Sequence, residues 1–450
     1  MGIEDKYSLT EGGIIKKLLL IAIPIMGNQF LQMAYNLTDM FWLGKLGSEA
    51  VAASGAAGMF MWLSFGFMLI GRMGAEIGIA QSLGRGDKKA ALAYFHNAFI
   101  IAAILGIFYA LCMIVFRREL IGFFRFRETG VTENGVTYLL IVSTMMPLSF
   151  IGIVIGGAFQ AAGNSRTPFI MVAVGVVANV ILDPVFIIVL GMGVRGAALA
   201  TILSQFFSFF VNMGAIFLLR IKPFGGFSFR LRFDKEKTIQ IFKWAIPIGL
   251  ENIFFCFLSM VTSRIEAGFG ASAVAASRIG SQVESLSWLI GAGFGSALVA
   301  FIGQNYGAGK QERIDRVVRL SSVIMTVWGL FVMAFLWFAG RYVFALFLPA
   351  PEMMALGIPY LRILSFCQLA MNIEAVGSGA FKGTGRTIEP SIVVIATNAI
   401  KPVLAFLLSR TSLGLYGIWI GVVISANLRG IWMNIWYAAA RRKKFSGKSP

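Results

Sequence analysis

Residues 99–115 read FIIAAILGIFYALCMIV, a run without a single charged side chain. A helix needs about 20 mostly apolar residues to cross a hydrocarbon core of roughly 30 Å. Only helices and closed barrels satisfy their backbone hydrogen bonds in that environment, and a barrel strand would alternate apolar with polar residues. Because residues 99–115 show no such alternation, they predict a transmembrane helix.

The same kind of stretch fills most of the chain. Hydrophobic residues make up 58% of its 450 residues and charged residues only 13%, with a mean hydropathy of +0.79. A soluble protein carries about 25% charged residues. The sequence therefore predicts an all-α polytopic membrane protein with twelve transmembrane helices. We place them near residues 18–43, 51–81, 91–115, 137–161, 167–190, 197–219, 239–264, 274–304, 318–340, 355–381, 390–409 and 414–439.

The net charge of +18 predicts orientation rather than nucleic-acid binding. Lys and Arg gather in alternate loops: 24 of the 39 lie in one set of segments, which includes both termini, and nine lie in the opposite set. Cytoplasmic loops of membrane proteins carry the excess of positive charge. We expect a multi-pass protein of the cell inner (plasma) membrane, surrounded by lipid, with both termini cytoplasmic and no nucleic-acid partner.

The chain contains an internal duplication. The sequence AIPI at residues 22–25 recurs at residues 245–248, which is 223 residues later. At the same shift, QSLGRG at 81–86 is matched by QNYGAG at 304–309, so Gln and both Gly residues keep their spacing. Self-similarity at a fixed shift indicates structural repeats.

The shift spans six predicted helices, an even number, so both halves enter the membrane from the same side. They are then parallel repeats about an axis along the membrane normal. We expect an N-terminal six-helix lobe at residues 1–221, a cytoplasmic linker at 222–237 and a C-terminal six-helix lobe at 238–450. Two such bundles around a central cavity suit alternating access.

Two acids lie deep in predicted spans, Asp39 in the first and Asp183 in the fifth. A charged side chain at the bilayer centre costs roughly 2.5–3.5 kcal/mol, so it usually faces the bundle interior and marks an ion route. Asn179 and Asp183 are four residues apart and share a helical face, and Tyr35 and Asp39 have the same spacing. Thr201 in the sixth span adds a hydroxyl to this set.

Pro184 has no N–H, which leaves the carbonyl of Val180 without its helical partner beside these oxygens. Such an all-oxygen set suits a hard cation such as sodium. Two carboxylates close together in a low dielectric can equally share a proton near neutral pH. A purely structural alternative also stays open: Asp39 hydrogen-bonds to Tyr35, and the Asn179–Asp183 pair stabilises a proline kink.

The chain resembles the multidrug and toxic compound extrusion (MATE) transporters over essentially its whole length. The order and spacing of several motifs carry this resemblance. They are YNLTD at 35–39, GKLG at 44–47, AAGNSRTP at 161–168, NVILDP at 179–184 and GAALAT at 196–201.

The resemblance implies a secondary antiporter that expels organic cations or drugs in exchange for protons or sodium ions. It implies amphipathic cationic small molecules as partners, a monomer, and no cofactor besides the transported ion. It also implies a cation-coupling role for Asp39, Asn179, Asp183 and Thr201, which would be the sodium ligands if the protein is sodium-coupled. For substrate binding we consider Tyr35, Tyr138 and Asp39.

The second half has not kept the acid pair. Asp39 corresponds to Thr262 by the shift of 223 residues, and Asp183-Pro184 aligns with Lys401-Pro402. The coupling chemistry is therefore expected in the N-terminal lobe.

The second half carries other charges inside its predicted spans. Some MATE members have a sodium-binding acid in spans 7 and 10, and those positions here are Phe255 and Met371, neither of which ionises. We expect the acids of this half to form ion pairs with Arg278 or Lys401. The acids are Glu251, Glu284 and Glu374. Whether Glu251 or Glu374 contributes to coupling stays open.

A lipid-linked oligosaccharide flippase of the same superfamily is the alternative function. Its anionic pyrophosphate cargo favours a basic cavity, whereas the N-terminal half is acidic. An enzyme is not expected, because no His-rich, Asp-rich or Ser/His arrangement is present, and no cysteine spacing predicts a metal. A duplication with an off-axis acid site disfavours a channel. The residues do not select the coupling ion or the substrate.

Overall fold

The long apolar stretches are helical in the computed structural model, which describes residues 7–126, 128–217, 233–347 and 351–445. Contacts group the chain into two compact units. The first comprises Met1–Gly249 and Gly303–Gly309, and the second comprises Leu250–Ile302 and Lys310–Pro450. Each unit is described by itself.

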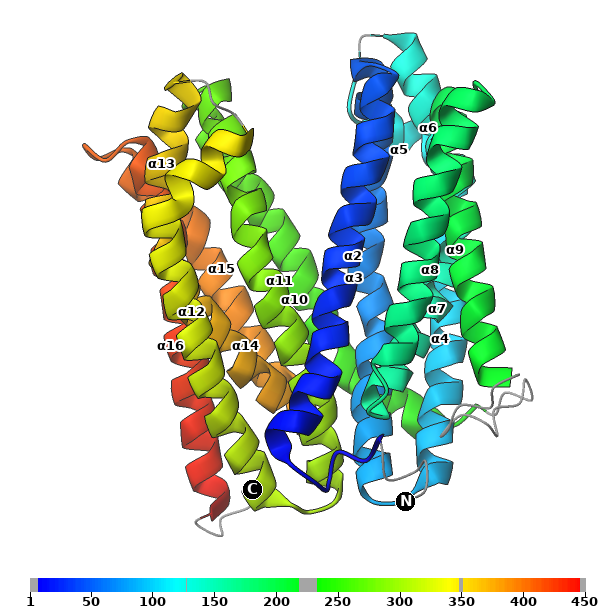
Figure 1. The fold of residues 1–450 in the computed structure, drawn as a ribbon, viewed down its shortest axis with the longest axis vertical. Coiled ribbons are helices and arrows are strands. Elements are labelled where there is room, and N and C mark those ends of the chain that lie inside the picture. Colours follow the sequence, from blue (N-terminus) through cyan, green and yellow to red (C-terminus); the bar gives the residue numbers. More distant parts are fainter. Residues whose placement is uncertain (1–6, 127, 218–232, 348–350, 446–450) are drawn as a thin grey trace. The chain divides into compact units, whose positions relative to one another are not determined.

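In the first unit, α3 packs against α4, α6 and α7, while α8 packs against α2 and α9 (Figure 1). This unit also contains the first half of α10. Its helices are α2 Ile14–Lys45, α3 Ser48–Gly84, α4 Lys88–Val115, α5 Arg117–Gly122, α6 Thr129–Ser143, α7 Met146–Ala161, α8 Arg166–Pro184, the π-helix η1 Val185–Val189, α9 Gly193–Phe217 and α10 Lys235–Ala267.

The second unit repeats this packing with the equivalent helices. As α8 packs against α9 in the first unit, α15 packs against α16, and as α4 packs against α7, α12 packs against α14. Its helices after α10 are α11 Ala271–Gly307, α12 Gln311–Phe347, α13 Pro351–Ser365, α14 Gln368–Gly383, α15 Ile388–Ser409 and α16 Leu415–Phe445.

Within the described residues, 10 helices are long and apolar enough to cross a membrane. Two further pairs, α6–α7 and α13–α14, pass the same test together and bring the number to 12 if each pair counts as one span. All twelve predicted spans therefore coincide with a helix or a bent pair of helices, and the predicted fold class is confirmed. The predicted linker lies mostly outside the described residues, and its last three residues already belong to α10. The lobe boundaries stay a prediction.

The fourth and tenth spans are bent, whereas the sequence predicted a continuous helix for each. The bends are 49° between α6 and α7 and 46° between α13 and α14. Equivalent glycines lie against the residues that follow the two bends. A Cβ on Gly106 would be 2.8 Å from the Cα of Pro147, and a Cβ on Gly329 would be 2.8 Å from the Cα of Leu369. In both bent pairs, the backbone just after the bend lies close to a glycine of a neighbouring helix. A proline after the bend is present in only one of them.

The duplicated glycines also end helices in the same way in both repeats. Gly86 after α3 and Gly309 after α11 have φ angles of 77° and 69°. Gly163 after α7 and Gly385 after α14 have φ angles of 83° and 80°. Side chains with a Cβ rarely adopt this left-handed conformation, so glycine ends each of these helices. The glycines that recur in the sequence therefore end equivalent helices in the two repeats.

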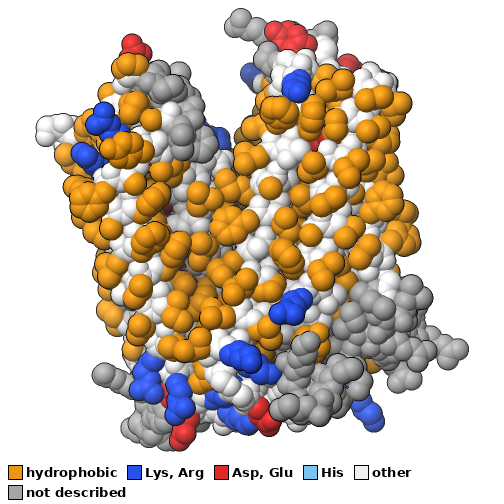
Figure 2. All heavy atoms as spheres, viewed as in Figure 1, with side chains coloured by type: hydrophobic (Ala, Val, Ile, Leu, Met, Phe, Trp, Pro, Cys, Tyr) orange, Lys and Arg blue, Asp and Glu red, His pale blue; other side chains and the backbone are white. Residues whose placement is uncertain are grey.

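The surface of each unit is that of a membrane protein. Figure 2 shows hydrophobic side chains along the flanks of the helices, while Lys and Arg gather mostly toward the helix ends. Large apolar side chains are exposed in the middle of helices, among them Phe108 at 65% and Phe338 at 76%. In water such a surface would drive aggregation, but it suits contact with lipid. The protein is a multi-pass membrane protein.

Candidate functional site

The six residues predicted to bind the coupling ion or the substrate all lie in the first unit. The helices that carry them are in contact, since α8 packs against both α2 and α9, and α6 packs against α9. The residues are Tyr35 and Asp39 in α2, Tyr138 in α6, Asn179 and Asp183 in α8, and Thr201 in α9.

The α8 pair is the most deeply buried part of this group. Asn179 and Asp183 are both 0% exposed, and Thr201 is 5% exposed. The amide Nδ2 of Asn179 donates a hydrogen bond of 3.0 Å to Oδ1 of Asp183. The predicted shared face of this helix is therefore real, and it faces the interior of the unit.

Several oxygen atoms of the group are buried and form no hydrogen bond within the described part of the chain. Burying a polar oxygen without a partner costs about 1–3 kcal/mol, so a cluster of them is rare unless it serves a purpose. Together they offer carboxylate, amide and hydroxyl oxygens to a proton or a cation. The atoms are Tyr35 Oη, Asp39 Oδ1, Asn179 Oδ1, Asp183 Oδ2 and Thr201 Oγ1.

The two acids are close enough to interact. Asp39 and Asp183 affect each other electrostatically, and the hydroxyls of Tyr35 and Tyr138 both lie near Thr201. Two carboxylates that are both ionised would repel each other in this environment, and one positive ion or proton relieves that repulsion. The group can therefore hold one unit of positive charge more favourably than none.

The purely structural alternative had two parts, the Asp39–Tyr35 hydrogen bond and the Asn179–Asp183 pair beside the proline kink, and their outcomes differ. Tyr35 Oη forms no hydrogen bond among the described residues, so the alternative in which Asp39 binds Tyr35 is wrong. The Asn179–Asp183 bond does lie beside a helix irregularity: α8 ends at Pro184 and continues as the π-helix Val185–Val189. There the N–H of Leu190 donates to the carbonyl of Val185 at 2.9 Å. Such π-turns occur frequently at functional sites. The free carbonyl of Val180 stays a prediction.

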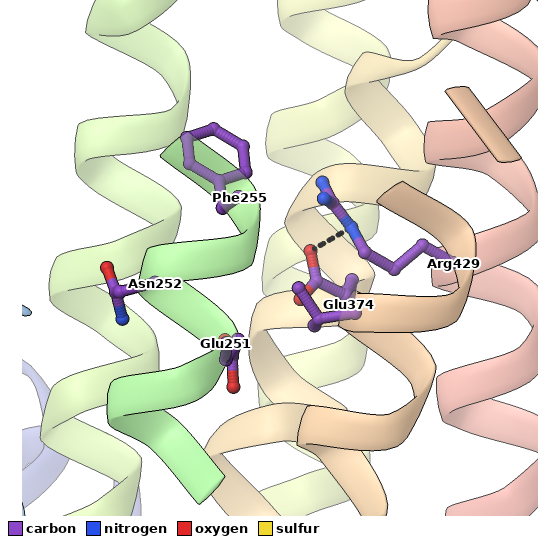
Figure 3. Close-up of a pocket in the computed structure, with 6 residues that line it drawn as sticks. Glu251, Asn252, Phe255, Glu374 and Arg429 are labelled. Carbon is purple, nitrogen blue, oxygen red and sulfur yellow. Dashed lines mark ion pairs between the residues drawn. The ribbon is translucent and has the colours of Figure 1, made fainter. Parts of the chain in front are cut away.

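In the second unit, two of the acids are ion-paired as expected, but with other partners than Arg278 and Lys401. Glu251 lies 3.6 Å from Nζ of Lys382 and accepts a 3.0 Å hydrogen bond from Ser391. Glu374 lies 3.1 Å from Nε of Arg429, and the two side chains face each other in Figure 3. Each pair joins two helices, so no spacing along the chain could indicate it.

Glu284 is the acid for which an ion pair was wrongly expected. It accepts hydrogen bonds from Nε2 of Gln368 at 3.0 Å and from Sγ of Cys367 at 3.8 Å. Sequence reasoning missed a further buried acid, Glu266, which accepts a 2.8 Å hydrogen bond from the indole of Trp419. Glu266 lies in the last turn of α10, where charged residues are usually exposed. The sequence therefore did not indicate that it is buried.

The sequence model of the MatE family matches residues 24–185 and, a second time, residues 247–407. The chain belongs to this family. The two matches start at the equivalent prolines Pro24 and Pro247, which confirms the internal duplication. Membership makes the protein a membrane transporter rather than an enzyme.

Curated relatives of the family match along nearly their whole length. A probable multidrug resistance protein NorM of Thermotoga maritima is 27% identical, over 96% of this chain and 94% of the relative. The probable multidrug resistance protein YpnP of Bacillus subtilis is 25% identical, over 92% and 91%. A protein of Shewanella oneidensis described as an FAD transporter is 24% identical, over 87% of both chains.

Solved transporter structures share the fold. A MOP superfamily transporter from Pyrococcus furiosus, described as having a binding pocket of reverse polarity, superposes with a TM-score of 0.91 at 23% identity, covering 97% of both chains. An outward-facing multidrug resistance MATE transporter also gives 0.91 at 23% identity, covering 98% of both chains.

Proposed function

We propose that this protein is a secondary antiporter that exports amphipathic organic cations or drugs in exchange for protons or sodium ions. The observation that supports it is the cluster of buried, unpartnered oxygens contributed by α2, α8 and α9. Several relatives are named as multidrug resistance or export proteins, which supports small molecules as cargo. The coupling ion is itself a substrate, so no bound cofactor is required.

Exchange follows from competition for one negative charge. A proton or sodium ion at Asp39, Asn179, Asp183 and Thr201 compensates one negative charge of the acid pair and stabilises one conformation of the transporter. A cationic drug that is attracted to the same charge, with Tyr35 and Tyr138 beside it, stabilises another. Because the ion and the drug compete for the same negative charge, they do not bind together. Entry of the ion is therefore coupled to exit of the drug.

The alternative function, a lipid-linked oligosaccharide flippase, is less well supported. Its pyrophosphate cargo is anionic, and the buried acids of the first unit would repel it. We further propose that the protein lies in the plasma membrane as a monomer. The distribution of Lys and Arg supports a topology in which both termini are cytoplasmic.

The test is transport by the purified protein in proteoliposomes. Ethidium movement is followed by fluorescence while a proton gradient, a sodium gradient or neither is imposed. We expect one of the two gradients to drive ethidium against its concentration gradient, and the effective one identifies the coupling ion. Downhill movement that ignores both gradients would refute antiport. Competition by undecaprenyl pyrophosphate, together with no effect of either ion, would favour the flippase.

A further inference from the structure

The lysine that replaces the acid of the fifth span lies buried in the second unit. Lys401 in α15 is 9% exposed and occupies the repeat position of Asp183. Its Nζ donates a 3.0 Å hydrogen bond to Oγ of Ser259 in α10. It also lies 5.2 Å from the ring centroid of Phe255 in the same helix. An ammonium group has three N–H donors. One hydrogen bond to a hydroxyl and one contact with an aromatic face do not satisfy all three.

No carboxylate among the described residues is ion-paired with Lys401. The charged group that acts on it is a second cation, Arg429. The six buried or half-buried acids among the described residues of this unit are engaged elsewhere. Asp315 pairs with Arg441, and Glu389 pairs with Arg386. Glu251 pairs with Lys382, Glu374 pairs with Arg429, Glu284 accepts from Gln368 and Cys367, and Glu266 accepts from Trp419. Lys401 is therefore a buried cation without a counter-charge, which is an unfavourable state for a lysine.

A pocket of about 150 Å³ lies between the helices that carry this lysine and its partner Ser259. Phe255, which touches the ammonium of Lys401, lines the pocket together with Arg429 and Glu374 (Figure 3). Val394 of α15 also lines it, and Lys401 lies two turns further along the same helix face. Ser259 lies one turn beyond Phe255 on α10. The Lys401–Ser259 pair thus lies beyond one end of the pocket, on two of the helices that line it.

We propose that Lys401 and Ser259 bind an anionic group, a carboxylate or a phosphate, of the transported molecule. An anion at this point supplies the counter-charge that the fold omits, and it accepts from both the ammonium and the hydroxyl. Glu374 is ion-paired with Arg429, so it does not serve as the counter-charge of Lys401. The substrates then include amphiphiles that carry a carboxylate or phosphate, zwitterions among them. This inference rests on the proposed function only in treating the bound molecule as cargo.

The experiment uses two compounds that differ in one charge. Norfloxacin is a zwitterion with a carboxylate and an amine, and its ethyl ester keeps the amine but has no carboxylate. Binding of both to the purified full-length protein is measured by calorimetry. The variants are Lys401→Met, Ser259→Ala and, as a control, Lys243→Met, because Lys243 is exposed on α10.

We expect the wild type to bind the acid more tightly than the ester. Lys401→Met should weaken binding of the acid about tenfold or more and leave the ester unchanged. Ser259→Ala should act in the same sense but less, and Lys243→Met should have no effect. Unchanged ester binding also shows that the variant is folded. Equal loss for both compounds, or no loss for the acid, would overturn the anion site.

Two further measurements test whether the anion at Lys401 belongs to the cargo. Binding is repeated in phosphatidylcholine nanodiscs with and without phosphatidylglycerol. Loss of the Lys401-dependent preference when phosphatidylglycerol is present would mean that a lipid phosphate is the occupant, and it would overturn the assignment to cargo. Gradient-driven export is measured for both compounds in proteoliposomes. Intact acid binding without export of either compound would refute the proposed function and leave the anion site standing.

Discussion

Gly84 and Gly307, which are equivalent in the two repeats, each lie against the backbone at the other's helix end. A Cβ on Gly84 would collide with the carbonyl oxygen of Gln304, and a Cβ on Gly307 would collide with that of Gln81. All four residues belong to the first unit. The duplicated Gln-x-x-Gly sequence therefore forms a reciprocal contact in which backbone meets backbone.

We predict that Gly84→Ala destabilises the protein by roughly 1–3 kcal/mol, because the added methyl group meets a backbone atom that cannot rotate away. The measurement is the apparent melting temperature of the purified protein. Gly55→Ala in the same helix is the matched control, since a Cβ there meets nothing within 4 Å. Equal melting temperatures for the two variants would contradict the close contact.

Gln304 ties the N-terminal segment to the end of α7. Its Nε2 donates to the carbonyl of Ala161 at 2.7 Å, and its Oε1 accepts from the N–H of Leu9 at 3.0 Å. Gln304→Met should cost about 2–4 kcal/mol, since two buried backbone groups lose their partners. Gln311→Met, which removes only a 3.5 Å contact to Asp315, is the control. If both variants unfold at the same temperature, the two bonds contribute nothing.

For the half-buried Glu374–Arg429 ion pair, we expect that removing one partner destabilises the protein more than removing both. Arg429→Met leaves Glu374 without its partner and should destabilise the protein by about 3–5 kcal/mol. The double variant that adds Glu374→Gln should recover much of this loss. The control pair is Arg386–Glu389, which is more exposed and should cost under about 1 kcal/mol when broken. A double variant no better than Arg429→Met alone would show that the charge of Glu374 is not the cause.

Asn179 should tune the affinity of the coupling ion without abolishing transport. Asn179→Ala removes the 3.0 Å bond to Asp183, and we expect the apparent affinity for the driving ion to fall about tenfold. Asn212→Ala is the control, because among the described residues the amide of Asn212 bonds only to the carbonyl of Ser208 within its own helix. The measurement is the transport rate at increasing ion concentration. Identical curves for both variants would remove Asn179 from the site.

Most of the fold was predictable because membrane crossing imposes simple rules. The length of the apolar stretches predicted the twelve spans, and the repeated motifs predicted that the two halves share one fold. The bends in the fourth and tenth spans were not predictable. The close approach of Gly106 and Gly329 to the residues after the bends involves other helices, and such tertiary packing leaves no local signal.

In the candidate site, too, features within one helix were predictable and contacts between helices were not. The spacing of Asn179 and Asp183 predicted their shared face correctly, because the pair lies within one helix. The partners of Glu251 and Glu374 were predicted wrongly, because Lys382 and Arg429 come from other helices. The π-helix after Pro184 was missed as well, since a proline indicates a break but not how the backbone re-forms beyond it.

The central claim is that Asp39 and Asp183 bind the coupling ion. It is tested most directly by gradient-driven ethidium export in proteoliposomes that contain Asp39→Asn, Asp183→Asn or the control Glu133→Gln, an exposed acid of α6. We predict that both aspartate variants lose the response to the driving gradient while Glu133→Gln keeps the wild-type response. Wild-type export by either aspartate variant under the same gradient would contradict the account.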